Sequence, residues 1–292
     1  MIGDQAENLR AAAGVALGRL SPSGPHACRV LAVTGGKGGV GKTNIAVNLS
    51  LALCEAGARV LLLDADLGLA NADLLLGLNP RYTLQNVVHR EVPLEGIVVE
   101  GPLGLRLLPG GTGLPEMASL STMEILRLLG ALRGLEAESD FLVIDTAAGI
   151  GHTVLRFALA ADDVVIVCTP EPPAMLDAYG VIKALNGARC TSQLQLLVNM
   201  VRHRREALDT HRTLAVVAGR YMGLSLGLLG GVPLDDNIVQ CIKQQVPFFL
   251  KLPQSHAARE LRRIAAGFIN EAVVSAVHAR EGFFTRLVNS MR

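Results

Sequence analysis

The chain has 292 residues, half of them hydrophobic, which is enough for one large α/β domain or two small ones. Its formal net charge of +1 argues against a globally basic nucleic-acid binder and against an acidic disordered protein. The sequence has no basic start with an apolar run and no uninterrupted apolar stretch of about 18 residues. We therefore expect neither a secretory signal nor a membrane-spanning helix.

Five cysteines are scattered along the chain, and none forms a C-x-x-C pair. An odd number of scattered cysteines fits poorly with a disulfide framework and predicts reduced thiols in a cytosolic protein. The missing C-x-x-C pair also counts against an iron–sulfur carrier, which needs paired cysteine ligands. The cysteines are Cys28, Cys54, Cys168, Cys190 and Cys241.

Short runs rich in β-branched residues or leucine predict the strands of a sheet. The runs are apolar throughout rather than alternating in polarity, which is typical of strands buried on both faces. They are RVLAVTG from Arg29, RVLLLDAD from Arg59, LRLLPG from Leu105, FLVIDTA from Phe141, DVVIVCTP from Asp163, LQLLVNM from Leu194 and LSLGLLGGVP from Leu224.

Helical patterns lie between these runs. The alternation predicts right-handed βαβ units and an α/β fold, with a mostly parallel, twisted sheet and helices on both faces. We expect one domain over residues 27–277, because the sequence shows no repeats and no low-complexity linker. Residues 1–26 and 278–292 fall outside the pattern and form two appendages. The helical patterns include Thr43–Glu55, Met123–Leu135, Ala174–Leu185 and Glu206–Tyr221.

The segment VTGGKGGVGKTN contains the spacing G-x-x-x-x-G-K-[ST], directly after a predicted strand and before a predicted helix. In that context the backbone N–H groups of a glycine-rich loop and the helix N-terminus bind phosphate. We expect Lys42 to contact the β- and γ-phosphates of ATP, and the Thr43 hydroxyl to bind Mg²⁺. The residues expected to bind ATP or ADP here are Gly36, Lys37, Gly38, Gly39, Val40, Gly41, Lys42, Thr43 and Asn44.

Acidic residues end two of the predicted strands, at the edge where open α/β sheets bind ligands. The run FLVID ends at Asp145, and LLLDAD ends at Asp64 and Asp66. Asp145 follows the pattern of an element that positions Mg²⁺, and the pair could hold metal or orient a water. A strand-end cap for Asp145 and an ordinary acidic loop for the pair are the alternatives.

The combination of GKGGVGKT, DADLGLANAD and VIDTAAGI resembles the MinD/ParA class of P-loop ATPases, from about Arg29 to Leu252. The resemblance implies a slow, partner-regulated ATPase that forms a homodimer around ATP. Lys37 matches the signature lysine, which contacts the nucleotide of the partner subunit; a solvated lysine is the alternative. Asp66 matches the aspartate that orients the attacking water. With Lys42, these two residues are the catalytic candidates.

The same resemblance implies roles for further residues. Asp64 matches the acidic residue that supports Mg²⁺ and the switch segment, so the metal candidates are Thr43, Asp64 and Asp145. Ala148 and Gly149, after Asp145, match the second switch, whose backbone lies near the γ-phosphate.

Two later segments, LLVNMV and GGVPLDDNIV, match the adenine-facing parts of the class. They imply that Asn199 contacts the base and that Pro233 lies beside the ring. An asparagine after a strand is also a common turn residue, which is the alternative for Asn199.

Finer features are similar to the flagellar-number regulators of this class, known as FlhG or FleN. Asn44 departs from the double threonine usual in cell-division MinD, and DQAENLR matches the D-Q-A-x-x-L-R element of the flagellar subgroup. That element implies stimulation of the signal-recognition-type GTPase FlhF. A helix packed on its own domain, or a frayed end, is the alternative. The candidate partner contacts are Asp4, Gln5, Leu9 and Arg10.

The segment EGFFTRLVNSMR predicts a short amphipathic helix that resembles the C-terminal membrane-targeting helix of MinD-type proteins. Two copies on one dimer would bind a bilayer more strongly than one, which would couple membrane binding to ATP. A helix folded into a groove of its own core is the alternative, and both can hold in different nucleotide states. The expected membrane face is Phe283, Phe284, Leu287, Val288 and Met291.

We therefore expect a cytoplasmic ATPase, peripheral on the inner face of the cell membrane when ATP-bound, that regulates flagellar number or placement. A flagellar transcription activator and the switch-ring (C-ring) proteins are further candidate partners. Cell-division-site MinD and a ParA-type DNA-partition ATPase are the alternative functions. Because the basic stretches VRHRRE and RELRR are short and interrupted, we expect no direct nucleic-acid binding.

Overall fold

Eight strands form one sheet in the order β3-β4-β2-β5-β1-β6-β7-β8 in the computed structural model, which describes residues 28–66, 71–89, 91–110, 131–275 and 282–291. All neighbouring strands are parallel except β3 and β4. The strands are β1 (Arg29–Thr34), β2 (Val60–Ala65), β3 (Val99–Glu100), β4 (Arg106–Pro109), β5 (Phe141–Thr146), β6 (Asp163–Cys168), β7 (Gln193–Val201) and β8 (Gly227–Pro233).

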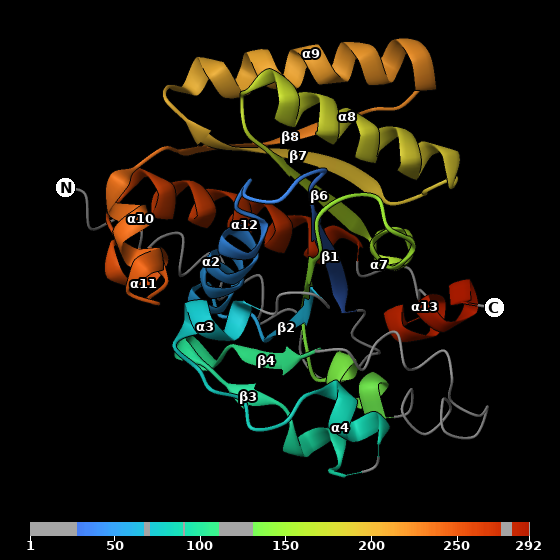
Figure 1. The fold of residues 1–292 in the computed structure, drawn as a ribbon, viewed down its shortest axis with the longest axis vertical. Coiled ribbons are helices and arrows are strands. Elements are labelled where there is room, and N and C mark those ends of the chain that lie inside the picture. The colour runs from blue at the N-terminus through green and yellow to red at the C-terminus, as the bar shows by residue number, and fades with distance from the viewer. Residues whose placement is uncertain (1–27, 67–70, 90, 111–130, 276–281, 292) are drawn as a thin grey trace.

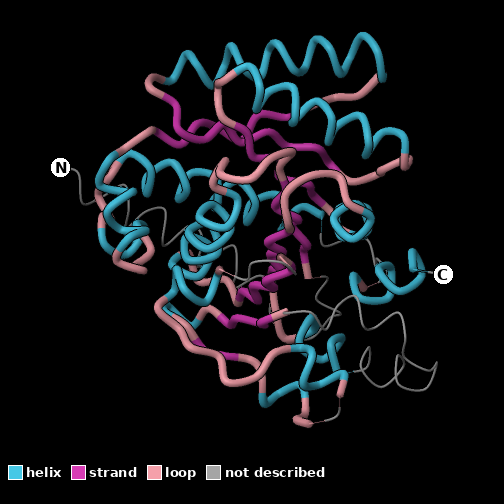
Figure 2. Tube along the Cα trace, in the orientation of Figure 1, coloured by secondary structure: helices cyan, strands magenta, loops and turns pink. Residues whose placement is uncertain are grey.

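Helices cover both faces of this sheet, as Figures 1 and 2 show. They are α2 (Lys42–Glu55), α3 (Ala72–Leu76), α4 (Leu84–Val88), α7 (His152–Ala160), α8 (Pro172–Gly187), α9 (Arg204–Met222), α10 (Asp236–Lys243), α11 (Phe248–Lys251), α12 (His256–Ser275) and α13 (Phe283–Met291). Short 3₁₀ turns lie at Leu94–Gly96 and Pro102–Gly104. Within the described residues, no helix is both long enough and apolar enough to cross a membrane.

Some of the sequence-based expectations fall outside the described residues. These are the N-terminal extension with Asp4, Gln5, Leu9 and Arg10, and most of the helix expected over Met123–Leu135, of which residues 131–135 are described and helical. Residues 67–70 of the DADLGLANAD motif and the side chains of Val288 and Met291 also lie outside.

Each central strand contributes side chains to two cores, because successive residues of a strand point to opposite faces. In β1, Leu31 and Val33 join α2 and α12 in one core. Val30 and Ala32 join α7, α4 and α13 in the other. A third cluster lies between β6, β7 and helices α8 and α9. The continuous apolar runs thus correctly predicted central strands buried on both faces, whereas β8, at one end of the sheet, is mostly half-buried.

The sheet differs from the prediction in two ways: one strand starts later than expected, and one strand was not predicted. The run from Leu224 starts later, at Gly227, because Gly223 and Leu224 close the end of α9. Gly223 adopts a left-handed conformation with φ 65°, and the N–H of Leu224 donates to the carbonyl of Ala218. The antiparallel strand β3 was not predicted, since two residues carry no usable periodicity.

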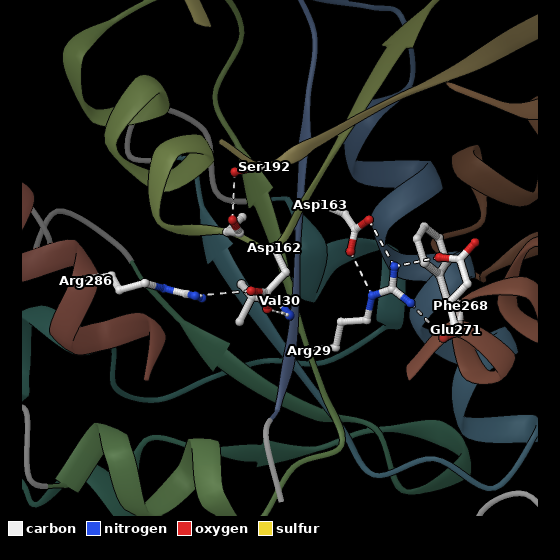
Figure 3. A network of polar contacts seen from close by, with 9 residues as sticks. Arg29, Val30, Asp162, Asp163, Ser192, Phe268, Glu271 and Arg286 are labelled. Carbon is white, nitrogen blue, oxygen red and sulfur yellow. Dashed lines mark hydrogen bonds and ion pairs between the residues drawn. The ribbon is translucent and has the colours of Figure 1, made fainter. Parts of the chain in front are cut away.

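A polar network ties the two C-terminal helices to the edge of the sheet where β1 and β6 begin (Figure 3). Arg29 donates to the carboxylate of Asp163 at 2.8 Å and 3.0 Å and to Glu271 of α12 at 2.7 Å. Asp162 accepts from the N–H of Val30 at 2.9 Å and from Arg286 of α13 at 3.1 Å. Neighbouring aspartates therefore anchor α12 and α13 separately.

Helix α13 packs its apolar face against the core rather than presenting it to solvent. Phe283, Phe284 and Leu287 are at most 4% exposed, and the ring of Phe283 stacks on Phe157 of α7 with centroids 6.3 Å apart. Glu136 accepts the backbone N–H of Phe283 at 2.7 Å, which satisfies one of the free donors at the start of the helix. The groove on the protein's own core is therefore occupied in this state.

Candidate nucleotide site

The phosphate loop connects β1 to α2 and has room only for glycine at Gly35, Gly36 and Gly41. Gly41 has φ 92°, and a Cβ there would lie 2.3 Å from the side-chain nitrogen of Asn199. At Gly36, a Cβ would lie 2.3 Å from the backbone oxygen of Asp177 in α8. Glycine is needed at Gly41 both for the left-handed backbone and for the close approach.

The two lysines of the loop differ in environment. Lys42 is buried, and its Nζ lies 3.4 Å from the carbonyl oxygen of Lys37. Burial lowers the pKa of Lys42, while the charges of Asp145 and Asp66 act against that shift. Lys37 itself is exposed at the loop surface. Lys42 therefore points into the site, while the side chain of Lys37 is accessible from outside.

Asp145 is the most deeply buried acid of the site. Its side chain is fully buried, and both carboxylate oxygens lack a hydrogen-bond partner among the described residues. Burial raises its pKa to about 7, while the nearby Thr43 hydroxyl and Lys42 act against that shift. An unsatisfied buried carboxylate beside a hydroxyl is a donor set that suits Mg²⁺, directly or through a bound water. Thr43 and Asp145 therefore fit the metal implied by the phosphate loop.

Asp64 uses its carboxylate to hold the chain that follows β2. It accepts backbone N–H groups from Asp66 at 3.2 Å, and from Asn71 and Ala72 at 3.1 Å each. Burial raises its pKa to about 6, and these hydrogen bonds act against the rise. Among the described residues, Asp64 holds the backbone of Asp66, Asn71 and Ala72, and its direct contact with Mg²⁺ stays a prediction.

A pocket of about 590 Å³ opens beside the loop, a size that suits a small-molecule ligand. One wall is polar and carries most of the residues expected from the sequence. The apolar wall comes mainly from β8, α10 and α11, with Leu74 and Leu75 of α3. The polar wall includes Gly38, Gly39, Gly41, Lys42, Thr43, Asn44, Asp66, Ala148 and Asn199; the apolar wall includes Val232, Pro233, Leu234, Ile238, Val239, Ile242 and Phe248.

Sequence reasoning missed most of the apolar wall. Pro233 was expected, but Ile238, Ile242 and Phe248 were not. The signal was present in DNIVQCIK, whose apolar residues recur at helical spacing just after Pro233. An amphipathic helix at that place predicts a surface that faces a ligand or a partner.

Asn199 also lines the pocket. Its Nδ2 donates to the carbonyl oxygen of Val40 at 2.9 Å, so its amide holds the phosphate loop. The contact of Asn199 with the base stays a prediction. Asn199 lies inside β7 and not in a turn after it, so the turn-residue alternative is wrong.

Comparison with known proteins agrees with this geometry. The AAA domain family matches residues 28–196. The antiactivator FleN of Pseudomonas aeruginosa is 40% identical over 82% of this chain and 86% of its own length. The flagellum site-determining protein YlxH of Helicobacter pylori is 33% identical over 89% of this chain and 90% of its own length.

A solved structure of MinD has a similar fold. The cell division ATPase MinD of Pyrococcus furiosus is 25% identical, with a TM-score of 0.66 over 83% of this chain and 99% of its own. The chain belongs to the MinD/ParA family of P-loop ATPases.

One solved structure of the family contains a nucleotide. The MinD structure from Pyrococcus horikoshii was solved with Mg-ADP, and it has a TM-score of 0.64 over 82% of this chain and 94% of its own, at 25% identity. The pocket of this MinD/ParA-family P-loop ATPase is lined by phosphate-loop residues of the kind that hold such a ligand. Its homologues FleN and YlxH place it beside the flagellar members of the family.

Proposed function

We propose that this protein is an ATP-dependent dimerising switch that regulates flagellar number or placement. The observation that carries the proposal is the similarity to FleN and YlxH over most of the chain, combined with the phosphate loop and pocket described above. In such a switch, ATP forms the dimer and slow hydrolysis dissolves it.

Dimerisation around ATP is supported by what surrounds Lys37. The lysine is exposed, so it is accessible to the nucleotide of a second subunit. Two large apolar side chains are also exposed beside the loop, Ile150 at 55% and Leu176 at 69%. Gly149, which precedes Ile150, contacts Gly35 of the loop, and Asp177, which follows Leu176, fills the space beside Gly36. Exposed apolar groups around an accessible cation suit an interface between subunits.

In this proposal both subunits contribute residues to each hydrolysis site: one supplies the phosphate loop and the acids, and the other supplies a lysine. Lys42 would hold the β- and γ-phosphates, and Asp66 would orient the attacking water. Thr43 and Asp145 would hold Mg²⁺, which offsets phosphate charge. Lys37 of the second subunit would stabilise the charge that develops on the γ-phosphate.

Membrane association requires α13 to leave its groove, because Phe283, Phe284 and Leu287 are buried there. The second switch offers a route for the nucleotide to influence that release. Gly149 contacts the phosphate loop, α7 begins at His152 shortly after it, and Phe157 of α7 stacks on Phe283. We propose that the ATP dimer loosens α13 and presents its apolar face to the bilayer, so that the protein is peripheral on the inner face of the cell membrane.

The N-terminal extension is the proposed contact with the GTPase FlhF, through Asp4, Gln5, Leu9 and Arg10. A transcription activator and the switch-ring proteins are further proposed partners, since the FleN relative is an antiactivator. A peptide of residues 1–26 should accelerate GTP hydrolysis by FlhF, and the same peptide with Gln5→Ala should not. Equal stimulation by both peptides would remove Gln5 from this role.

Division-site MinD is the second candidate, because MinD of Thermotoga maritima is 33% identical over 84% of this chain and 89% of its own length. The two functions separate in cells that lack their own flagellar-number regulator. Expression of the wild-type chain should restore flagellar number without altering septum position. Displaced septa with unchanged flagellation would favour the division-site function.

A further inference from the structure

Two asparagines one helical turn apart lie inside α2, the helix that follows the phosphate loop. Asn44 is half-buried and lines the nucleotide pocket. Asn48 is fully buried and does not line it. A fully buried polar side chain requires partners, and those of Asn48 lie on both sides of it.

On one side, Asn48 serves the start of α11. Its Oδ1 lies 2.9 Å from the backbone nitrogen of Phe249. Because a backbone N–H can only donate, the atom of Asn48 that faces it must be the oxygen. The contact satisfies an N–H in the first turn of α11, next to Phe248 in the apolar wall of the pocket.

On the other side, the orientation of Asn48 determines that of Asn44. With its oxygen engaged by Phe249, Asn48 presents its NH₂ group, which lies 2.7 Å from both the backbone oxygen and the Oδ1 of Asn44. The two hydrogens of the amide match these two acceptors. Asn44 must therefore direct its own oxygen to Asn48, which leaves its Nδ2 as the edge that is free to face the pocket.

We propose that Asn48 is a positioning residue that orients the amide of Asn44 so that its N–H₂ group binds a nucleotide phosphate. Phosphate oxygens accept hydrogen bonds and cannot donate them, so a reversed Asn44 would turn an oxygen toward the anion. We call the chain of hydrogen bonds from the Phe249 N–H through Asn48 to Asn44 the relay. It starts at the backbone of α11, beside the apolar wall, and ends at the phosphate side of the same pocket. The proposal rests on nucleotide binding at this site. It adds Asn48 to the residues that determine binding, although Asn48 does not line the pocket.

The test is a double-mutant cycle that measures Mg·ADP binding by calorimetry. The variants are Asn48→Ala, Asn44→Thr and the double variant. A threonine hydroxyl rotates and can donate to phosphate without help from Asn48. In the wild-type background, Asn48→Ala should therefore raise the Kd for ADP about tenfold. In the Asn44→Thr background, the same change should raise it less than about twofold. Asn48→Ala should lower Tm in both backgrounds.

Ser50→Ala is the matched control. Ser50 is also fully buried in α2, and its hydroxyl donates to the carbonyl of Ala46 at 2.7 Å, without reaching the pocket. We expect it to lower Tm and to leave the Kd for ADP within about twofold, so that lost stability alone does not mimic the relay.

The relay would be overturned if Asn48→Ala weakened ADP binding equally in both backgrounds, or in neither. If Asn48→Ala does not fold, Asn48→Asp takes its place, because it keeps an oxygen for Phe249 and lacks the NH₂ group; the same coupling is expected. Absence of ADP binding by the wild-type protein would instead overturn the nucleotide site, and the relay with it.

Discussion

The backbone N–H of Gly149 donates to the carbonyl oxygen of Gly35 over 2.9 Å, which joins the loop after β5 to the start of the phosphate loop. Gly149 has φ 94°, a conformation that favours glycine. A group bound at the phosphate loop would therefore lie next to a segment that is hydrogen-bonded to Gly149. This contact is the physical basis for the proposal that nucleotide state reaches α7 and α13.

The first prediction concerns pH. Burial raises the pKa of Asp145 to about 7 and that of Asp64 to about 6, so the folded protein retains protons that the unfolded chain releases. Their contribution therefore lowers the unfolding free energy as pH rises from about 4 to about 7. Asp145→Asn should reduce this fall and raise the unfolding free energy of the ligand-free protein at about pH 8 by roughly 1–3 kcal/mol. Urea unfolding at several pH values measures it.

The control for this measurement is Asp209→Asn, because Asp209 is 57% exposed on α9. It should leave the pH dependence of stability unchanged. Asp145→Asn should also lose most of the Mg²⁺ dependence of ADP binding, since a neutral amide is a weaker Mg²⁺ ligand than a carboxylate. An Asp145→Asn protein with the wild-type pH profile would contradict the environment described for this carboxyl.

The second prediction concerns the exposed lysine. Lys37→Ala should bind Mg·ATP with an affinity within about threefold of wild type, because Lys42 supplies the cation within the subunit. It should remain monomeric where the wild-type protein dimerises, and light scattering with ATP distinguishes the two. Lys183→Ala, on α8, removes a lysine away from the loop and should dimerise normally. A normal ATP dimer of Lys37→Ala would refute the action of Lys37 in trans.

The third prediction concerns the docking of α13. Glu136→Ala removes the acceptor for the N–H of Phe283 and should weaken docking by about 0.5–2 kcal/mol. We expect more protein to float with anionic liposomes in the absence of nucleotide. Glu138→Ala removes a 66% exposed acid that pairs with Arg106 and should leave flotation unchanged. A lower Tm for Glu136→Ala with no gain in flotation would contradict the proposal that α13 binds the membrane.

The strands and the phosphate loop could be predicted from the sequence because their physical causes are local. Apolar runs such as VLAVT in β1 need burial on both faces, and the G-x-x-x-x-G-K-T spacing sets the backbone itself. The parallel order of the sheet follows from the intervening helices.

The remainder depended on contacts between distant parts of the chain. Nothing near Asn48 in sequence indicates that Phe249 supplies its partner, and nothing near Asn199 indicates that it holds Val40. For α13, an apolar helix face has the same sequence pattern whether it covers a membrane or a groove. The stacking of Phe283 on Phe157 and the burial of Phe284 and Leu287 show that the helix covers a groove in the present state.

The most direct test of the switch uses Asp66→Ala, which should bind ATP but hydrolyse it at least about a hundredfold more slowly, since no carboxylate orients the water. Size-exclusion chromatography with light scattering, together with liposome flotation, would compare this variant with Mg·ATP and with Mg·ADP. The account predicts a dimer that floats with ATP and a monomer that does not float with ADP. A protein that is monomeric and unbound in both states would show that the fold and pocket are present without the switch.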